Sequence, residues 1–268
     1  MLTTQWTIHH ITHSPSGDVV IITCQVEEVF TFFEGQFMVL QTLIGDKIIK
    51  RSYSIYSTNQ QLQDTKTISF CIKRKDQWVF STRATQVATV GMQITMTWPV
   101  GRFVDDSASR NYLFISVGSG LSPCFSIYQQ LIRTDQYNKI ANLFGERYLD
   151  HIPWEVLDAY SIQSEKIYNR ICLSKEQPIS HSGLDPESLV NSWDPALTAE
   201  EQETSSEWHN SQLRKSGYVQ SGIDDALVFL DTQDVTVFVC WLPAMCEEVA
   251  QILQDKGIEK RRLIIEKY

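Results

Sequence analysis

Apolar and polar positions alternate in short runs along residues 5–104, which is the pattern of half-buried β-strands. Clusters of turn residues such as Ser14–Gly17 separate the runs. The predicted strands are Trp6–Thr12, Asp18–Val26, Phe37–Leu43, Arg51–Tyr56, Thr67–Lys73 and Ile94–Trp98. A short helix is expected from Ser81, whose hydroxyl can cap the first turn. Six short strands and one short helix predict a small antiparallel barrel, which we assign to residues 1–106.

After the polar stretch Asp105–Ser109, continuous apolar strands alternate with helical segments. The predicted strands are Tyr112–Val117, Ile140–Phe144, Ile171–Leu173, Val235–Cys240 and Leu263–Ile265. The predicted helices are Pro123–Arg133, Trp154–Tyr160, Ile223–Leu230 and Glu247–Lys256. This alternation predicts a doubly wound parallel sheet, which we assign to residues 107–268. Ligands of such sheets bind beyond the carboxyl ends of the strands.

The segment Pro178–Ser216 interrupts this pattern, because it carries seven acidic residues against two basic ones and no apolar periodicity. Such a composition predicts a long, exposed and partly disordered insertion at about 178–216. Trp193 and Trp208 stand out in so polar a stretch. They either pin the insertion to the body of the protein, which is the interpretation we favour, or contact a partner.

Composition narrows the class of protein. Hydrophobic residues make up 43% of the 268 residues and charged residues 21%, which is typical of a globular chain. A net charge of −9 argues against a nucleic-acid binder, which needs a basic face. No apolar run is long enough to span a membrane, and the N-terminus lacks the features of a signal peptide. We therefore expect a cytoplasmic protein.

The cysteine and histidine residues do not predict a metal site. The six cysteines are scattered through apolar runs without a Cys-x-x-Cys spacing, which favours reduced, buried thiols. His9, His10 and His13 are expected to be solvated on the first hairpin.

The string Arg51-Ser52-Tyr53-Ser54 offers a cation, an aromatic ring and a hydroxyl, which we expect to share one face of a strand. Such a set suits a flat, anionic ligand, because arginine can fork onto a phosphate and tyrosine can stack. In isolation the string is also compatible with an ordinary surface strand.

Polar or glycine residues follow the predicted parallel strands where those strands end. Gly118-Ser119-Gly120 joins a strand to a helix, where a backbone can approach a phosphate. Further candidates at strand ends are Arg147, Ser174, Lys175, Cys240, Glu266 and the terminal Tyr268. We expect them to converge on one sheet edge. The alternatives are a tight turn without a ligand for the glycines and a small core side chain for Cys240.

In this order the motifs resemble those of the ferredoxin–NADP reductase family, over nearly the whole chain outside the insertion. The resemblance implies an antiparallel six-stranded FAD-binding barrel followed by a doubly wound, NADP-binding parallel sheet. It implies that Arg51 binds the flavin pyrophosphate, that Tyr53 stacks on the isoalloxazine and that Ser54 lies near flavin N5. The other FAD-binding residues implied are Cys71, Lys73, Ser81, Thr82 and Tyr268.

The resemblance also implies the residues that bind NADP. They are Gly118, Ser119, Gly120, Arg147, Ser174, Lys175, Tyr218 and Gln220. Cys240 and Glu266 are implied to position the nicotinamide, and Tyr268 to cover the flavin. The sequence departs from the family pattern at Trp241 and Trp78, which replace glycines, and at Lys175, which replaces arginine.

The resemblance therefore implies an FAD-dependent oxidoreductase. It would transfer hydride between NADP(H) and the flavin, and single electrons to or from ferredoxin, flavodoxin or another small redox protein. One alternative is a reductase subunit of a larger oxygenase-type complex, with the insertion at 178–216 as a docking element. The other is a non-catalytic FAD-binding module in which Trp241 blocks access of the nicotinamide.

Overall fold

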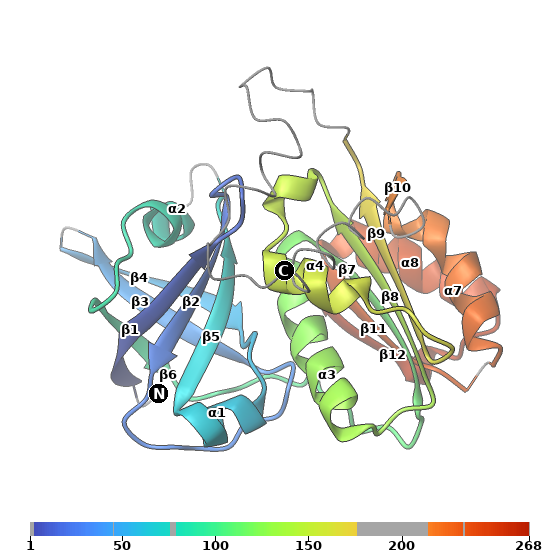
Figure 1. Cartoon of the computed structure of the whole chain (residues 1–268), viewed down its shortest axis with the longest axis horizontal. Coiled ribbons are helices and arrows are strands. Elements are labelled where there is room, and N and C mark those ends of the chain that lie inside the picture. The colour runs from blue at the N-terminus through green and yellow to red at the C-terminus, as the bar shows by residue number, and fades with distance from the viewer. Residues whose placement is uncertain (1–2, 45, 76–78, 176–213, 233, 268) are drawn as a thin grey trace, which may run out of the picture.

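The computed structural model describes residues 3–44, 46–75, 79–175, 214–232 and 234–267. It contains two six-stranded sheets that lie side by side, the first antiparallel and the second parallel (Figure 1). The predicted fold class, an antiparallel barrel followed by a doubly wound parallel sheet, is confirmed. We call the two parts the barrel half and the parallel half.

The barrel half is one curved sheet with the strand order β4-β3-β6-β1-β2-β5. Its strands are β1 (Thr3–His13), β2 (Val19–Gln25), β3 (Phe37–Ile44), β4 (Lys47–Ser54), β5 (Thr67–Lys73) and β6 (Gln93–Thr97). Just beyond β4, the N–H of Tyr56 donates to the carbonyl of Ser69 on β5 at 2.8 Å. This bond brings the two edge strands of the sheet, β4 and β5, together at this end.

Two helices belong to the barrel half, α1 (Asn59–Thr65) and α2 (Val79–Gln86). Only α2 was predicted. The Thr58 side chain caps α1 by accepting a hydrogen bond from the N–H of Gln61 at 3.1 Å. The sequence Thr58-x-x-Gln61 is a capping-box pattern, which is the signal that predicts this helix.

The parallel half has the strand order β10-β9-β8-β7-β11-β12. Its strands are β7 (Asn111–Val117), β8 (Lys139–Glu146), β9 (Ile167–Leu173), β10 (Arg214–Ser216), β11 (Thr236–Trp241) and β12 (Leu263–Lys267). Its helices are α3 (Leu121–Thr134), α4 (Trp154–Ser161), α7 (Ile223–Leu230) and α8 (Pro243–Asp255). Short 3-10 segments lie at Gly118–Gly120 (η1), Leu149–His151 (η2), Val219–Gly222 (η4) and Lys260–Arg262 (η5).

Most elements differ from the prediction by a few residues at one or both ends, and the largest differences are at β4, which begins at Lys47 rather than Arg51, and β9, which begins at Ile167 rather than Ile171. Two further differences have a clear cause. Helix α8 begins at Pro243 rather than Glu247, because a proline is well tolerated in the first turn, where its missing N–H has no partner to lose. The end of the predicted insertion forms β10, which pairs with β9. The rest of the insertion, with Trp193 and Trp208, lies outside the described residues, as does Trp78.

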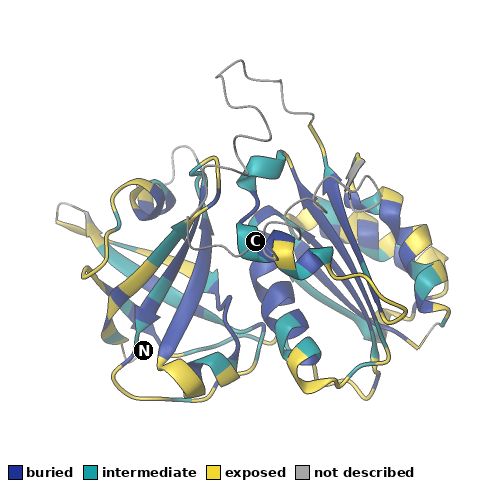
Figure 2. Ribbon diagram, in the orientation of Figure 1, coloured by how far each residue is buried: buried dark blue, intermediate teal, exposed yellow. Residues whose placement is uncertain are grey.

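Alternate residues of the parallel strands face two different layers. Aromatic residues face α3 and α4, and they include Tyr112, Phe114, Phe144 and Phe238. Smaller aliphatic residues face α7 and α8, and they include Leu113, Ile115, Val237 and Val239. In Figure 2 the strands of this sheet are largely buried, whereas the edge strand β4 and helix α1 of the barrel half are largely exposed.

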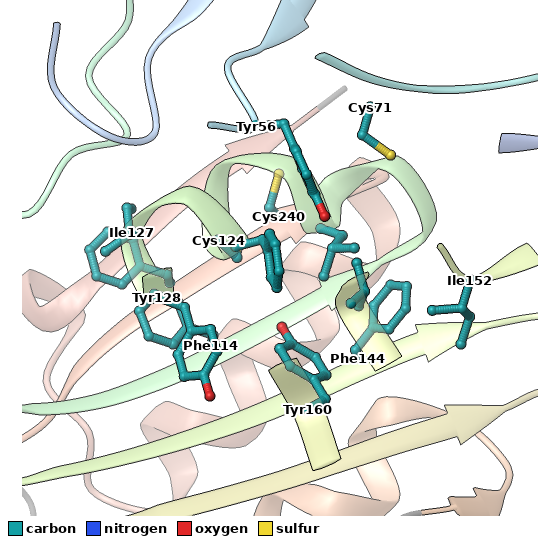
Figure 3. Close-up of a cluster of buried hydrophobic side chains, with 14 of the residues drawn as sticks. Tyr56, Cys71, Phe114, Cys124, Ile127, Tyr128, Phe144, Ile152, Tyr160 and Cys240 are labelled. Carbon is teal, nitrogen blue, oxygen red and sulfur yellow. The ribbon is translucent and has the colours of Figure 1, made fainter. Parts of the chain in front are cut away.

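A single hydrophobic cluster joins the two halves. Tyr56 and Cys71 point from the barrel half into the cluster that contains Cys124, Phe144 and Cys240 (Figure 3). The ring of Tyr56 stacks on Phe125 of α3 with 4.9 Å between centroids. Beside this stack, the hydroxyl of Ser126 donates to the carbonyl of Ser57 at 2.8 Å in a buried position. The halves therefore share a core, which fixes their relative position.

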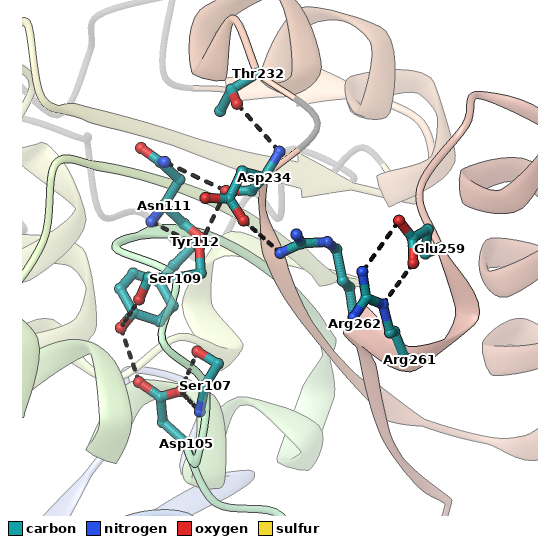
Figure 4. A network of polar contacts seen from close by, with 10 residues as sticks. All are labelled: Asp105, Ser107, Ser109, Asn111, Tyr112, Thr232, Asp234, Glu259, Arg261 and Arg262. Atoms are coloured by element: carbon teal, nitrogen blue, oxygen red, sulfur yellow. Dashed lines mark hydrogen bonds and ion pairs between the residues drawn. The ribbon is translucent and has the colours of Figure 1, made fainter.

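The segment between β6 and β7 is tied to the parallel half by polar contacts (Figure 4). The hydroxyl of Tyr112 donates to the carboxylate of Asp105 at 2.8 Å. The hydroxyl of Ser109 donates to the carbonyl of Asp234 at 2.9 Å, and the Asp234 carboxylate pairs with Arg262 at 2.5 Å. These bonds hold the connection against the edge of the sheet that is opposite to the carboxyl ends.

All six cysteines are buried, and His9, His10 and His13 are exposed on β1, as predicted. None of the helices in the described part of the chain is long and apolar enough to span a membrane.

A close backbone contact at Gly35 predicts a strong effect of substitution. Gly35 has a φ of +91°, and a Cβ atom added there would lie 1.8 Å from the carbonyl oxygen of Phe103. We expect Gly35→Ala to lower the free energy of unfolding by about 3 kcal/mol or more, measured by urea denaturation. Gly17→Ala is the control, because Gly17 has a φ of +73° but open space around it, and should lose only about 1 kcal/mol. Equal losses in the two variants would contradict the steric explanation.

Candidate functional site

The edge strand β4 carries the residues predicted to bind a flat anionic ligand. Arg51 is exposed, and its guanidinium donates to the carbonyl of Lys50 at 2.7 Å. The ring of Tyr53 is half-buried and lies 5.4 Å from the ring of Phe80 on α2. Burial raises the pKa of Tyr53, and the charge of Arg51 opposes this effect. Tyr53 is therefore neutral and available for stacking at physiological pH.

Ser54 is buried and ends the strand directly after Tyr53. Because successive side chains of a strand point to opposite faces, Arg51 and Tyr53 share a face and Ser54 lies on the other. The expectation of one common face is therefore wrong for Ser54.

Helix α2 adds two hydroxyls on the side of Tyr53. Ser81 follows Phe80 and is buried, and its hydroxyl accepts a hydrogen bond from the N–H of Lys75 at 3.1 Å. Thr82 is half-buried in the same turn. A cation, a ring and the first turns of a helix thus lie together, and this donor set fits a diphosphate attached to a flat ring.

The parallel strands end in register. Val117 of β7 lies opposite Gly145 of β8, and Cys240 of β11 lies between Ser116 of β7 and Glu266 of β12. Apart from Tyr268, which lies outside the described residues, the residues predicted at strand ends therefore lie along one edge of the sheet, as expected for a doubly wound fold.

The glycine turn η1 packs tightly against the end of β11. Gly118 has a φ of +54°, and a Cβ atom added there would lie 2.8 Å from the indole of Trp241. A Cβ atom added at Gly120 would lie 2.2 Å from the carbonyl oxygen of Cys240. Both glycines are thus required by packing, whether or not a phosphate binds. Ser119, between them, is half-buried.

A second group of predicted residues lies beyond β9. Ser174 and Lys175 are exposed, and the N–H of Lys175 donates to the carbonyl of the exposed Arg147 at 3.1 Å. The N–H of Gly217 donates to the carbonyl of Leu173 at 2.9 Å, which brings Tyr218 beside them with 71% of its surface exposed. A cation, a hydroxyl and an exposed ring fit an adenosine that carries a phosphate.

Gln220 lies two residues after Tyr218, and its amide donates to the carboxylate of Glu248 on α8 at 3.0 Å.

Cys240 is fully buried, and Glu266 is its half-buried neighbour on β12. Burial raises the pKa of the nearby Cys124, and the charge of Glu266 adds to this effect. Tyr268 lies outside the described residues.

A charged cluster between the halves was not predicted. Lys73 of β5 forms an ion pair with Glu146, which ends β8 and is 5% exposed. The ring of His151 lies 3.6 Å from Glu146 and 3.4 Å from Asp18, and Asp18 also pairs with Arg74 at 2.6 Å. Asp18, Lys73 and Arg74 belong to the barrel half, and Glu146 and His151 to the parallel half. The ammonium of Lys73, predicted to lie beside the flavin, is therefore engaged by the opposite half.

The halves leave little space at this point. A cavity of about 10 Å³ is bordered by Cys71, Lys73, Gly118, Ser119 and Glu146, among others. Strand β5 thus lies directly against the glycine turn. A cavity of about 320 Å³ between α1 and α3 is bordered by none of the predicted site residues.

No family model matches the chain. The structure superposes on a ferredoxin–NADP reductase from Neisseria gonorrhoeae, solved with bound FAD and NADP, with a TM-score of 0.73 and 16% identity. The match covers 99% of this chain and 98% of that one. The chain has the ferredoxin–NADP reductase fold. This confirms the fold that the resemblance implied.

The chain is also similar in sequence to several known proteins, and two of these matches cover most of the chain. The chain is 22% identical to ferredoxin–NADP reductase A of Sorangium cellulosum over 245 residues, which cover 86% of the chain and 76% of the relative. It is also 22% identical to the toluate 1,2-dioxygenase electron transfer component of Pseudomonas putida over 239 residues. That match covers 88% of the chain but only 59% of the length of the relative.

The ion pair between the halves predicts a pH-dependent stability. Burial opposes ionisation of Glu146, but contacts with His151, Lys73 and the N–H of Arg147 outweigh it and lower the pKa of Glu146 below its usual 4.5. A lowered pKa stabilises the folded state above pH 4.5, and this stabilisation is lost as the pH falls through the folded pKa.

We therefore expect Glu146→Gln to lower the free energy of unfolding by about 3 kcal/mol at pH 7, measured by urea denaturation. The difference from the wild-type protein should shrink below pH 4.5. Glu259→Gln, which removes an exposed pair with Arg261, is the control and should change little. A difference for Glu146→Gln that stays constant down to low pH would contradict the role of the charge.

Proposed function

We propose that the protein is an FAD-dependent oxidoreductase that moves electrons between NADP(H) and a small redox protein such as ferredoxin or flavodoxin. The observation that carries the proposal is the ion pair between Lys73 and Glu146. Lys73 belongs to β5 of the barrel half, which carries the candidates for FAD binding. Glu146 ends β8 at the edge of the parallel sheet where the candidates for NADP binding lie. An FAD bound by the barrel half and an NADP(H) bound by the parallel half would therefore meet at the interface between the halves.

The residues of the barrel half fit FAD. Arg51 would neutralise the pyrophosphate, with Ser81 and Thr82 at the start of α2, and Tyr53 would stack on the ring system. Ser54, on the other face of β4, would reach the ring from its edge. Bound FAD supplies the exchange between a two-electron hydride donor and one-electron carriers, and the protein supplies orientation and electrostatics.

The residues of the parallel half fit NADP(H). Ser174, Lys175 and Tyr218 would hold the 2′-phosphate and the adenine, with Gln220 beside them. Arg147 and the Gly118–Gly120 turn would lie along the pyrophosphate. Cys240 and Glu266, on adjacent strands, would then orient the nicotinamide toward the flavin, with Tyr268 covering the flavin face.

A second candidate is the reductase component of a multi-protein oxygenase system. It is supported by the likeness to the toluate dioxygenase electron transfer component, part of whose length has no counterpart in this chain. In that case the direct acceptor would be an oxygenase component or its iron–sulfur carrier. Six scattered, buried cysteines without a Cys-x-x-Cys spacing fit a reducing compartment, and we propose the cytoplasm.

The proposal is tested by the absorption spectrum of the purified protein. We expect a flavin spectrum that bleaches on anaerobic addition of NADPH, and NADPH-dependent reduction of ferricyanide. A flavin-loaded protein that stays oxidised in excess NADPH and in excess NADH would contradict the proposal. Relative rates with ferredoxins, flavodoxins and oxygenase components then separate the two candidates.

Selectivity for NADPH is predicted to depend on Lys175. We expect Lys175→Met to raise the KM for NADPH about tenfold and leave the KM for NADH unchanged, because one charge-assisted contact to the 2′-phosphate is lost. Lys166→Met is the control, because Lys166 is exposed at the opposite end of β9 and pairs with Asp135. Equal effects on both nucleotides would place the 2′-phosphate elsewhere.

A further inference from the structure

The indole of Trp241 covers the glycine turn at the point where the two halves meet. Its ring carbons would lie 2.8, 3.1 and 3.5 Å from a Cβ atom placed on Gly118. The ring is therefore in direct contact with the backbone of the turn, and only glycine permits this approach. The backbone surface of Gly118 is thus occupied by a side chain of the same protein.

A cation from the other half lies over the same ring. The ammonium of Lys75 is 5.7 Å from the centroid of Trp241, which is within cation–π range. Lys75 follows β5 of the barrel half, and Trp241 ends β11 of the parallel half. The contact therefore joins the halves directly over the turn.

The backbone of Trp241 is held on two sides. Trp241 pairs with Lys267 on the neighbouring strand β12, and its carbonyl accepts a hydrogen bond from the thiol of Cys246 on α8 at 3.4 Å. The indole itself is only partly buried. Uncovering the turn therefore requires rotation of the side chain and leaves β11 in place.

We infer that Trp241 is a gate over the nicotinamide end of the nucleotide site and that Lys75 holds the gate closed. The inference rests on the proposed function, because it assigns a regulating residue to the same site. The adenosine end, at Ser174, Lys175 and Tyr218, stays open in the closed state. A dinucleotide gains contacts at its nicotinamide end only after the indole has left Gly118, so closure weakens NADP⁺ and leaves the adenylate half unaffected.

The experiment compares two ligands by calorimetry on the flavin-loaded protein. NADP⁺ spans the whole site, and adenosine 2′,5′-bisphosphate fills only the adenosine end. In the wild-type protein we expect the two dissociation constants to agree within about threefold, because NADP⁺ makes no additional contacts at its nicotinamide end while the gate is closed. In Trp241→Gly, NADP⁺ should bind about tenfold more tightly and the bisphosphate unchanged.

Lys75→Met tests the gate with the indole in place. The hydrogen bond from Lys75 to Ser81 uses the backbone N–H and survives this change. We expect NADP⁺ to bind about two- to fivefold more tightly, the factor that corresponds to a cation–π contact. Lys166→Met is the matched control, because it removes a cation–π contact of 5.8 Å to Tyr137 away from the nucleotide edge.

The outcomes separate the gate from the proposed function. Weaker NADP⁺ binding in Trp241→Gly would show that the indole is a ligand for the nucleotide, and equal changes for both ligands would show a loss of structure. Either result would contradict the inference that Trp241 is a gate. Binding of neither ligand to the wild-type protein or to any variant would overturn the proposed use of NADP(H) itself. Trp241→Phe, which keeps an aromatic ring, should lie between the wild-type protein and Trp241→Gly.

Discussion

The arrangement of the site depends on one buried ion pair between the halves, Lys73 with Glu146. A carboxylate that is 5% exposed is stable only when it is paired, because burial of an unpaired charge is strongly unfavourable. Its partner comes from a different sheet, and the pair holds β5 against the carboxyl edge of β8. Together with the shared core, this pair therefore sets the position of the FAD-binding candidates of the barrel half relative to the NADP-binding candidates of the parallel half.

The apolar contact around this pair keeps the position fixed. Tyr56 stacks on Phe125, and Ser126 donates to the carbonyl of Ser57, so that α3 is bonded to the barrel half. With the halves joined in this way, we infer that access to the site is controlled by a side chain. The indole of Trp241 covers Gly118 at the carboxyl edge of the parallel sheet. The ammonium of Lys75, from the barrel half, lies over the same indole.

Periodicity was sufficient to predict every strand of the two sheets except β10, because each of the others has a local pattern of apolar residues, whereas β10 is Arg214-Lys215-Ser216. The convergence of the strand ends also followed from local information, since parallel strands share one carboxyl edge. Helix α1 was overlooked although Thr58 and Gln61 carry its capping signal. The pairing of Lys73 with Glu146 could not be predicted, because it depends on how two separately folded sheets pack. The close packing of Gly118 against Trp241 could not be predicted from the sequence for the same reason, because Trp241 belongs to a strand that is distant in the sequence.

The most direct test of the account is a charge-reversal cycle at the central ion pair. The rate of flavin reduction by NADPH, per bound flavin, would be measured for Lys73→Glu, Glu146→Lys and the double variant. Each single reversal places like charges together in a buried interface and should slow the reaction about hundredfold, whereas the double reversal should restore most of the rate. Single reversals that reduce the flavin at the wild-type rate, or a double reversal no faster than the singles, would contradict the account.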